Sequence, residues 1–407
     1  MHLSSTIYAA CTIAAAAAAA ARIYDTSLPP SHRPDQQSLN PEDAKQNKEP
    51  PTFGGILTNV LTDDTSQLEI RILDPNGRTT WNWTASRDLE KGFPHQLGNC
   101  TIHNSGRTDA KQSEDGSLIA AIYGDAIVAI RYAPDDPKTD KSVAWGICTN
   151  TSLLRSSHSL EFLPDNLLAV ATSGQSQDDG IVVYNMSLGL SPNPTPIQHI
   201  PHLPDAHALV WEKKTQILWA AGMNSSIDGK AAASGLINGY LYQPPSFSSN
   251  ALPLQQTPVS QHHLPDSSTT YTEWSDKPGL RDEWDAPHDL ILIPSQQHTF
   301  LIPTDLDIHA LNMSSGEFIS GQQVVDTYLK GFFPVGRRSG KNRKGDVEQL
   351  PRSDIKSVIF GPDGTPVYVQ ALWKDFFADK LNFLVKEERK QLDLRGTIYR
   401  ARYFRIK

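Results

Sequence analysis

The chain has 407 residues, a formal net charge of −8, 29 prolines and 26 glycines. The acidic balance and the lack of a basic stripe exclude an extended nucleic-acid-binding surface, and the many turn-forming residues indicate a β-rich protein. The single basic run, residues 337–344, is rich in glycine and serine, which predicts a solvated loop.

The N-terminus predicts the compartment. Residues 4–21 carry no charge and end in an alanine run directly before Arg22. This pattern is typical of a secretory signal peptide at residues 1–21, with an A-x-A cleavage site. An uncleaved anchor or an alanine-rich helix is the alternative. We therefore expect a secreted, extracellular protein without membrane association.

Residues 22–52 are polar and proline-rich, so they cannot bury enough apolar surface to fold. We expect a flexible leader there and one domain at residues 53–407, acting as a monomer. Six N-x-[ST] sequons are spread over this domain and predict surface N-glycans. They begin at Asn82, Asn99, Asn150, Asn185, Asn224 and Asn312.

Three cysteines are present, and Cys11 is lost with the predicted signal peptide. The remaining pair, Cys100 and Cys148, predicts one disulfide in an oxidising compartment.

An internal repeat organises the domain. Each of five segments has a small or acidic residue, a cationic residue, an apolar strand, a turn and a second apolar strand. The cationic residues are Lys111, His158, His207, His288 and Lys356, which are 47, 49, 81 and 68 positions apart. The first two spacings fit a propeller blade, and the larger two indicate insertions near 245–285 and 320–350.

These short strand pairs predict an all-β fold, a β-propeller with seven blades, six being the alternative. The N-terminal segments ILTNVL and LEIRILD are expected to share one blade with the C-terminal TIYRARYF and so close the ring. The only fair helix candidate is Phe376–Lys390.

The repeat also predicts a site. If each cationic residue opens an innermost strand, all five converge on one mouth of the central channel. A lone histidine is usually structural, but three in register favour a functional cluster. The acidic residues that precede them are either turn residues or groups that bind a cation or orient the histidines. These are Asp109, Asp205, Asp285 and Asp354.

Further candidates lie near this mouth by sequence. His103 and Arg107 precede the Lys111 strand, and simple surface exposure is the alternative for both. Surface exposure is the favoured interpretation for Arg155 and Arg281. Three tryptophans are candidates for stacking on sugar rings or for packing between blades: Trp83, Trp274 and Trp284.

The strings HSLEFLPDNLLAVATS, DAHALVWEKKTQILWAAG and APHDLILIP resemble a secreted propeller family of bacterial and fungal proteins. More loosely they are similar to propeller polysaccharide lyases, including oligogalacturonate lyase and the fungal rhamnose–glucuronate lyase. The resemblance covers residues 53–375. It implies a central histidine site with a divalent metal, Ca²⁺ or Mn²⁺, held by His158, His207 and His288. Lys111 and Lys356 depart from that pattern, and Gln370 is an uncertain match to a metal-binding glutamine.

A uronate lyase abstracts the proton beside a carboxylate, which needs a base of suitable pKa and a cation that offsets the carboxylate charge. The predicted catalytic set is His103, His158, His207, His288, Arg107 and Lys111. The favoured activity is cleavage of a rhamnose–glucuronate linkage in an arabinogalactan-type glycan. The alternative is a non-catalytic carbohydrate-binding propeller, since fold alone does not give function. No nucleotide-binding, P-loop, zincin or hydrolase-elbow motif occurs in the required context.

Overall fold

The computed structural model divides into two compact units, Met1–Glu49 and Pro50–Lys407. The described residues all belong to the second unit: 54–85, 95–101, 108–174, 176–191, 194–224, 234–244, 252–265, 269–270, 286–296, 298–304, 307–332, 338–342, 347–350, 353–371 and 376–405. The predicted signal peptide and leader therefore lie outside the described residues. Among the described helices, none is long and apolar enough to cross a membrane.

The unit is all-β, as expected. Four of its sheets have four antiparallel strands that follow one another in sequence. They are β4 (Ala110–Gln112), β5 (Leu118–Tyr123), β6 (Ala126–Arg131) and β7 (Val143–Cys148); β8 (Ser157–Leu163), β9 (Leu167–Thr172), β10 (Gly180–Asn185) and β11 (Gln198–Pro201); β12 (Ala208–Glu212), β13 (Ile217–Met223), β14 (Gly235–Leu241) and β15 (Ser260–His263); and β17 (Ile291–Leu292), β18 (Thr299–Pro303), β19 (Ile308–Asn312) and β20 (Glu317–Ser320).

An eight-stranded sheet joins the two ends of this unit. It contains β1 (Ile56–Thr62), β2 (Leu68–Leu73), β3 (Thr79–Trp83), β23 (Ile355–Phe360), β24 (Pro366–Gln370), β25 (Ala378–Val385), β26 (Glu388–Ile398) and β27 (Ala401–Tyr403). Strand β27 pairs with β1 in the register Ile56↔Tyr403. The expected sharing of one sheet by the N-terminal and C-terminal strands is thus confirmed.

The remaining elements are small. A three-stranded sheet holds β16 (Thr269–Thr270), β21 (Arg338–Asn342) and β22 (Val347–Leu350). The short helices are α3 (His95–Thr101), α4 (Gln322–Tyr328) and the 3₁₀ turn η2 (Met186–Leu188). The prediction of a loop at residues 337–344 is wrong for Arg338–Asn342, because this segment forms strand β21, which pairs with both β16 and β22.

The repeat predicted from sequence is confirmed as a structural unit. Its five segments form the antiparallel pairs β4–β5, β8–β9, β12–β13, β17–β18 and β23–β24. The tight turn after β8 places Asp165 and Asn166 at φ of 59° and 57°, and the turn after β23 places Gly364 at φ 81°. These residue types tolerate the left-handed region, which explains their use in the turns.

The helix expected at Phe376–Lys390 is wrong. The segment forms most of the β25–β26 hairpin, with Val385 paired to Glu388. Lys386 and Glu387 form its turn at φ 52° and 66°. Two positive φ values in a two-residue loop match the twist of a hairpin, so tertiary pairing overrides the helical preference of this charged segment.

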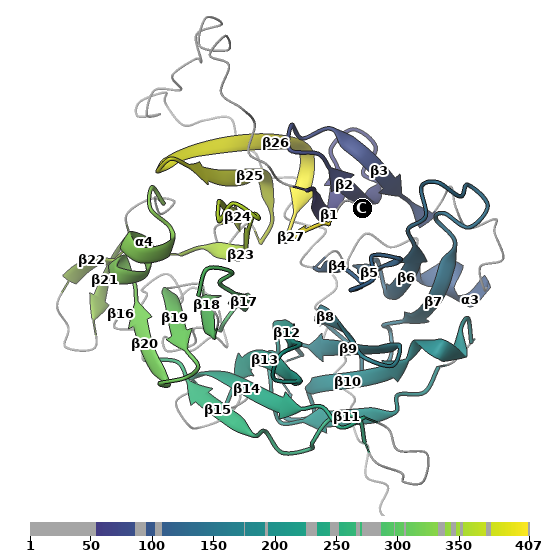
Figure 1. The fold of residues 1–407 in the computed structure, drawn as a ribbon, viewed down its shortest axis with the longest axis horizontal. Coiled ribbons are helices and arrows are strands. Elements are labelled where there is room, and N and C mark those ends of the chain that lie inside the picture. The colour runs from purple at the N-terminus through teal and green to yellow at the C-terminus, as the bar shows by residue number, and fades with distance from the viewer. Residues whose placement is uncertain are drawn as a thin grey trace, which may run out of the picture. The chain divides into compact units, whose positions relative to one another are not determined.

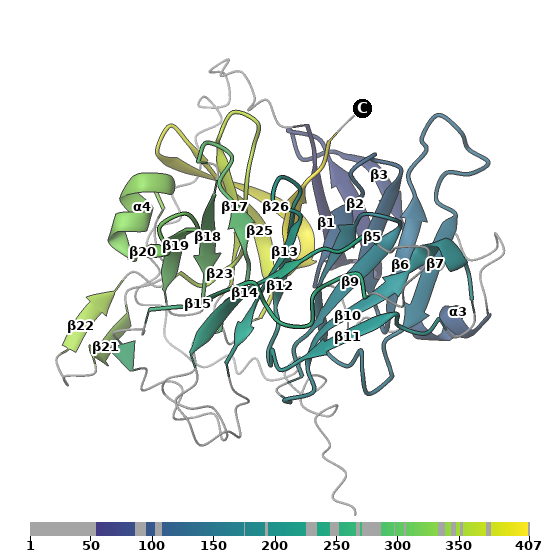
Figure 2. The same cartoon turned by 60° about the horizontal axis from the view of Figure 1, so that its bottom comes forward.

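The sheets follow one another around a common centre (Figure 1), and Figure 2 shows the same sheets from a tilted view. Strands β4, β8, β12, β17, β23 and β27 lie nearest that centre. Apolar side chains fill the spaces between neighbouring sheets. Trp145 and Tyr184, for example, belong to one cluster with side chains of β5, β6, β9 and β10. The four-stranded sheets and the eight-stranded sheet thus bury apolar side chains against their neighbours, which accounts for the apolar runs in their strands.

The structure also bears on the predicted disulfide and on the role of Trp83. Cys100 at the end of α3 and Cys148 at the end of β7 form the predicted disulfide, with Cα atoms 5.7 Å apart. Trp83 is 1% exposed and donates its indole N–H to the Lys141 carbonyl, so its role is packing. Sugar stacking is wrong for this tryptophan.

Candidate functional site

Three imidazoles from three sheets lie close together, with His207 in contact with both of the others. The ring centroids of His158 and His207 are 4.4 Å apart, and those of His207 and His288 are 5.3 Å apart. Each side chain comes from the beginning of an innermost strand: β8 for His158, and the residues just before β12 and β17 for the other two. The structure therefore brings together the three histidines that the repeat singled out, and we call them the histidine cluster.

The local backbone explains how these side chains are aimed. His158 sits at a register shift between Ser157 and Ser159, and Lys356 sits at an equivalent shift in β23. A β-bulge of this kind changes the direction in which one side chain leaves the hydrogen-bonded strand pair. The residues two positions earlier, Ser156 and Asp354, have φ of 58° and 45°.

Two of the histidines have a defined tautomer. Nδ1 of His158 lies 2.8 Å from the Ser156 carbonyl, and Nδ1 of His207 lies 2.9 Å from the Asp205 carbonyl. A carbonyl only accepts, so each Nδ1 carries the hydrogen and each Nε2 keeps its lone pair. Asp205, at φ 54°, thus orients His207 through its backbone, and its carboxylate lies 3.2 Å from the same nitrogen.

Burial and nearby cations keep these imidazoles neutral. Burial, together with the charges of Arg400, His288 and Lys356, lowers the pKa of His158 to about 4, although its hydrogen bond with the Ser156 carbonyl opposes the shift. Burial also holds the pKa of His207 well below its usual value, with contributions from the other two imidazoles and Arg400. Two neutral imidazoles with free lone pairs have the protonation state that a general base needs at neutral pH, but their lowered pKa makes them weaker bases than a free imidazole.

The third histidine contacts a buried cation and a phenol. Nζ of Lys356, which is 2% exposed, lies 2.9 Å from Nε2 of His288. The Tyr399 hydroxyl lies 3.4 Å from Nδ1 of the same ring. Tyr399 also stands edge-on to His158, with ring centroids 6.0 Å apart. The cluster therefore combines imidazoles with an ammonium and a hydroxyl.

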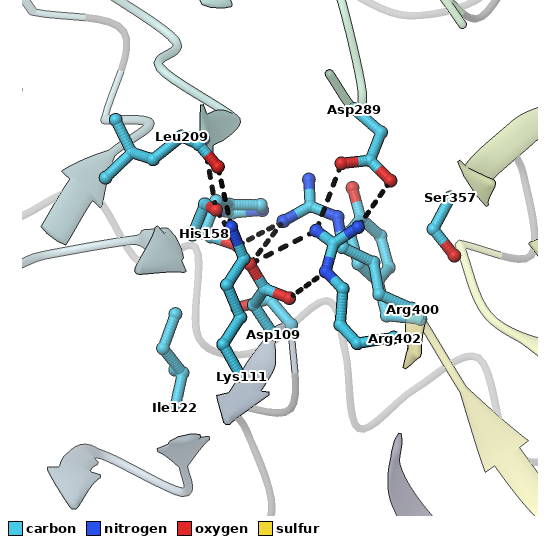
Figure 3. A network of polar contacts seen from close by, with 12 residues as sticks. Asp109, Lys111, Ile122, His158, Leu209, Asp289, Ser357, Arg400 and Arg402 are labelled. Carbon is cyan, nitrogen blue, oxygen red and sulfur yellow. Dashed lines mark hydrogen bonds and ion pairs between the residues drawn. The ribbon is translucent and has the colours of Figure 1, made fainter. Parts of the chain in front are cut away.

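The strand β27 and the residues before it bring two arginines to this site. Arg400 donates to the carbonyls of His158 and His288, so its guanidinium bridges two sheets. Arg402 binds both oxygens of Asp109 and both oxygens of Asp289, with its shortest contacts at 2.8 Å and 2.7 Å (Figure 3). These bidentate pairs fix the guanidinium plane.

The arginines and carboxylates of this site shift one another's pKa values. Burial of Asp109 raises its pKa, but the charges of Arg402, Lys111 and Arg400 outweigh this and lower it to about 2. Asp109 and Asp289 in turn raise the pKa of Arg402. Asp109 is thus a buried anion whose cationic partners are the guanidinium groups of Arg402 and Arg400.

The charge of Lys111 acts on Asp109, but its ammonium makes its hydrogen bonds elsewhere, one of them to Leu209 (Figure 3). It donates to Glu161 at 2.7 Å and to the Leu209 carbonyl at 2.6 Å. The structure therefore does not bring Lys111 into contact with the imidazoles, and its position favours an ion pair between neighbouring sheets.

Of the other residues predicted to lie near the site, the structure describes only Arg155 and Gln370. His103, Arg107, Arg281, Asp285, Trp274 and Trp284 lie outside the described residues. Arg155 is exposed, in agreement with the simpler interpretation. Gln370 is buried and donates Nε2 to the Ser353 carbonyl, whereas its Oε1 has no partner within the described part of the chain.

Four residues of the site were missed at the sequence level: Asp289, Tyr399, Arg400 and Arg402. The signal was present in TIYRARYF, where arginines alternate in a segment expected to be an innermost strand. Charged side chains at alternate positions of such a strand point to one face, and a buried face of this kind requires partners.

The described residues do not suit a divalent cation at the histidine cluster. Lys356 presents an ammonium to Nε2 of His288, and Arg402 occupies the carboxylates of Asp109 and Asp289. In the described part of the chain, no three His, Cys, Asp or Glu side chains are arranged to hold a metal. Arg402 is matched by two carboxylates and Lys111 by Glu161. The Lys356 ammonium and the Arg400 guanidinium, which lie beside the imidazoles, are the groups that suit an anionic ligand.

Comparisons with known proteins do not identify a family. No family model and no curated protein match the chain. A functionally unknown protein from Desulfotomaculum acetoxidans is 10% identical, with a TM-score of 0.42 over 85% of this chain and 78% of that one. PorZ of Porphyromonas gingivalis is 9% identical, with a TM-score of 0.43 over 83% and 40%. A Trichoderma reesei protein of Carbohydrate-Active Enzymes Family AA12 is 12% identical, with a TM-score of 0.38 over 88% and 100%.

Proposed function

We propose that this unit is a β-propeller of six blades. Six groups of four strands support it: β27 with β1–β3, then β4–β7, β8–β11, β12–β15, β17–β20 and β23–β26. The seventh blade favoured from sequence has no complete set of strands among the described residues, because β16, β21 and β22 form a three-stranded sheet. Pairing of the last strand with β1 is the closure that a propeller requires.

On this scaffold we propose a polysaccharide lyase that cleaves a uronate-containing glycan by β-elimination, with a rhamnose–glucuronate linkage as the favoured substrate. One observation carries the proposal: neutral imidazoles in contact with one another beside the cationic Lys356 and Arg400. A base and a positive field next to each other are what abstraction of a proton beside a carboxylate demands.

In this proposal Nε2 of His158 or His207 takes the proton from C5 of the uronate. The electron pair forms the C4–C5 double bond, the C4–O bond breaks, and the leaving oxygen carries the rhamnose. Tyr399 or a water supplies the proton to that oxygen. Lys356 and Arg400 offset the charge that develops on the carboxylate. The product is a 4,5-unsaturated uronate.

The test uses the ultraviolet absorbance of that product. The purified protein is incubated with arabinogalactan, pectin and other uronates, and the absorbance is followed with time. We expect a rise with at least one substrate, and a loss of at least a hundredfold in His207→Ala, since general bases contribute on the order of 10²–10⁴. If no uronate gives unsaturated product but one binds, the carbohydrate-binding alternative replaces the lyase.

We also propose that the protein is secreted and glycosylated. Among its sequons, Asn99, Asn150, Asn224 and Asn312 are exposed, and Asn82 and Asn185 are partly exposed. The exposure of the first four asparagines supports glycosylation at these positions. Mass spectrometry of secreted material before and after glycosidase treatment should show a mass loss and a mature N-terminus near Arg22. An unchanged mass or an intact alanine run would contradict this.

A further inference from the structure

A groove lies where three of the innermost strands end. Strands β4, β8 and β12 begin near the histidine cluster and finish at Gln112, Leu163 and Glu212. The turns that follow them surround a groove of about 840 Å³. His158 and Leu163 are five residues apart along β8, which corresponds to roughly 17 Å of strand. The groove is thus separate from the histidine cluster.

An aromatic wall lines one side of this groove. Trp211 and Phe162 both border it and are half-buried. The Trp211 ring meets Tyr242 edge-on with centroids 5.6 Å apart, and the Tyr242 hydroxyl donates to Asp165 at 2.6 Å. The indole is therefore held in place by packing. Within the described residues, no hydrogen bond of its own N–H is found.

The rest of the lining is rich in acceptors. Four carboxylates border the groove against two cations, Lys213 and Arg405. The carboxylates are Glu114, Asp115, Glu161 and Asp165. Glu161 uses Oε2 for Lys111, and Glu114 pairs with Lys213 while remaining 63% exposed. A net negative lining disfavours a polyanion and favours a ligand that donates hydrogen bonds.

We propose that this groove binds a neutral oligosaccharide. A sugar ring has an apolar face of C–H groups that packs on an indole, and a rim of hydroxyls that donate to carboxylates and amides. The volume suits two or three hexose units, since ligand sites span roughly 300–1,000 Å³. This proposal is independent of the lyase activity, because it concerns the opposite ends of the strands.

The test measures binding by intrinsic tryptophan fluorescence and calorimetry. The full-length secreted protein is titrated with three neutral probes: cellotriose, mannotriose and β-1,3-galactotriose. We expect at least one to bind with a Kd below 1 mM, that is, more tightly than about −4 kcal/mol. Trp211→Ala should weaken that binding at least tenfold, whereas His207→Ala should leave it unchanged.

A second pair of variants keeps the test valid if Trp211→Ala fails to fold. Glu114→Gln alters a lining carboxylate that pairs with Lys213, and should weaken binding at least threefold. Glu387→Gln is its control, because Glu387 is 68% exposed and pairs with Lys330 outside the groove. The proposal is overturned if none of the three probes binds, if both groove variants bind like wild type, or if oligolysine binds and the sugars do not.

Discussion

Individual histidines give the structure a specific pH dependence. His158 has a pKa of about 4 in the folded protein, below the value near 6.5 of an unfolded chain. Between these values the unfolded state binds more protons, so stability rises with pH across this window and is lost as pH falls from 6.5 to 4. Its contribution is on the order of 3 kcal/mol when fully present.

The check is urea unfolding of wild type and His158→Gln at pH 7 and pH 5. We expect wild type to lose more stability than the variant between these values, because the variant lacks the titrating group. An equal loss in both would show that His158 does not carry the effect. Catalysis should follow the same protonation, so the activity of wild type should hold from pH 8 to pH 5 and fall only near pH 4.

The buried arginine bridge is the second feature at the scale of residues. Arg402→Met removes the guanidinium that binds Asp109 and Asp289, so that Asp289 loses this ion pair and Asp109 keeps only Arg400, at 3.7 Å, and the Ser159 hydroxyl. Breaking a buried pair in this way costs about 3–5 kcal/mol. Denaturant unfolding at pH 7 should show a loss of this size. Lys330→Met is the control, since it breaks a pair with Glu387 in which both side chains are more than 60% exposed, and it should cost at most about 1 kcal/mol.

The sequence predicted the three histidines because the repeat places one residue type at one structural position. It did not predict what holds them. Arg400 and Asp289 meet the cluster through long-range contacts between segments more than 100 residues apart, which no local pattern encodes. The pairing of Lys111 with Glu161 was missed for the same reason, since it depends on which sheets are neighbours.

At the scale of elements, local preference and tertiary pairing disagree at Arg338–Asn342, which forms strand β21, and at the β25–β26 hairpin. The segment around Glu387 is rich in Lys, Arg and Glu, which are good helix formers, yet β25 and β26 pair over its whole length. The strand assignments elsewhere were correct because apolar β-branched runs between turn residues have no competing interpretation.

The β25–β26 turn offers a stabilising change. Lys386 and Glu387 both adopt positive φ, which costs roughly 1 kcal/mol or more for each non-glycine residue. The double substitution Lys386→Asn and Glu387→Gly supplies the preferred residues of such a turn. We expect a gain of about 1 kcal/mol in thermal or denaturant unfolding. A loss of stability would mean that the native turn contributes contacts beyond its backbone geometry.

The disulfide connects α3 to the outermost strand of the β4–β7 sheet. The two cysteines are 48 positions apart, and a loop of this size contributes about 4 kcal/mol in the chain-entropy model. The double variant Cys100→Ser and Cys148→Ser should therefore lower the free energy of unfolding by a few kcal/mol without changing the spectrum of the folded state. Equal stability in the presence and absence of reductant would contradict this.

For the whole molecule, the C-terminal strand has two roles at once. Strand β27 pairs with β1, and the Ser357 hydroxyl accepts the backbone N–H of Ala401. The same short stretch carries Tyr399, Arg400 and Arg402 to the histidine cluster. Closure of the proposed propeller and assembly of the site therefore depend on one segment.

Truncation tests this dependence. Removing residues 399–407 exposes the inner edge of β1 and leaves Asp109 and Asp289 without Arg402, so we expect loss of the cooperative unfolding transition rather than a modest shift. Removing only residues 405–407 is the control, because β27 and all three site residues remain, and the contacts of Arg405 with Gln112 are at the surface. That shorter truncation should unfold within about 1 kcal/mol of wild type. If the longer truncation keeps the wild-type midpoint, ring closure by β27 is not what stabilises the unit. If it folds but no longer shows the pH dependence assigned to His158, the C-terminal strand acts on the site alone.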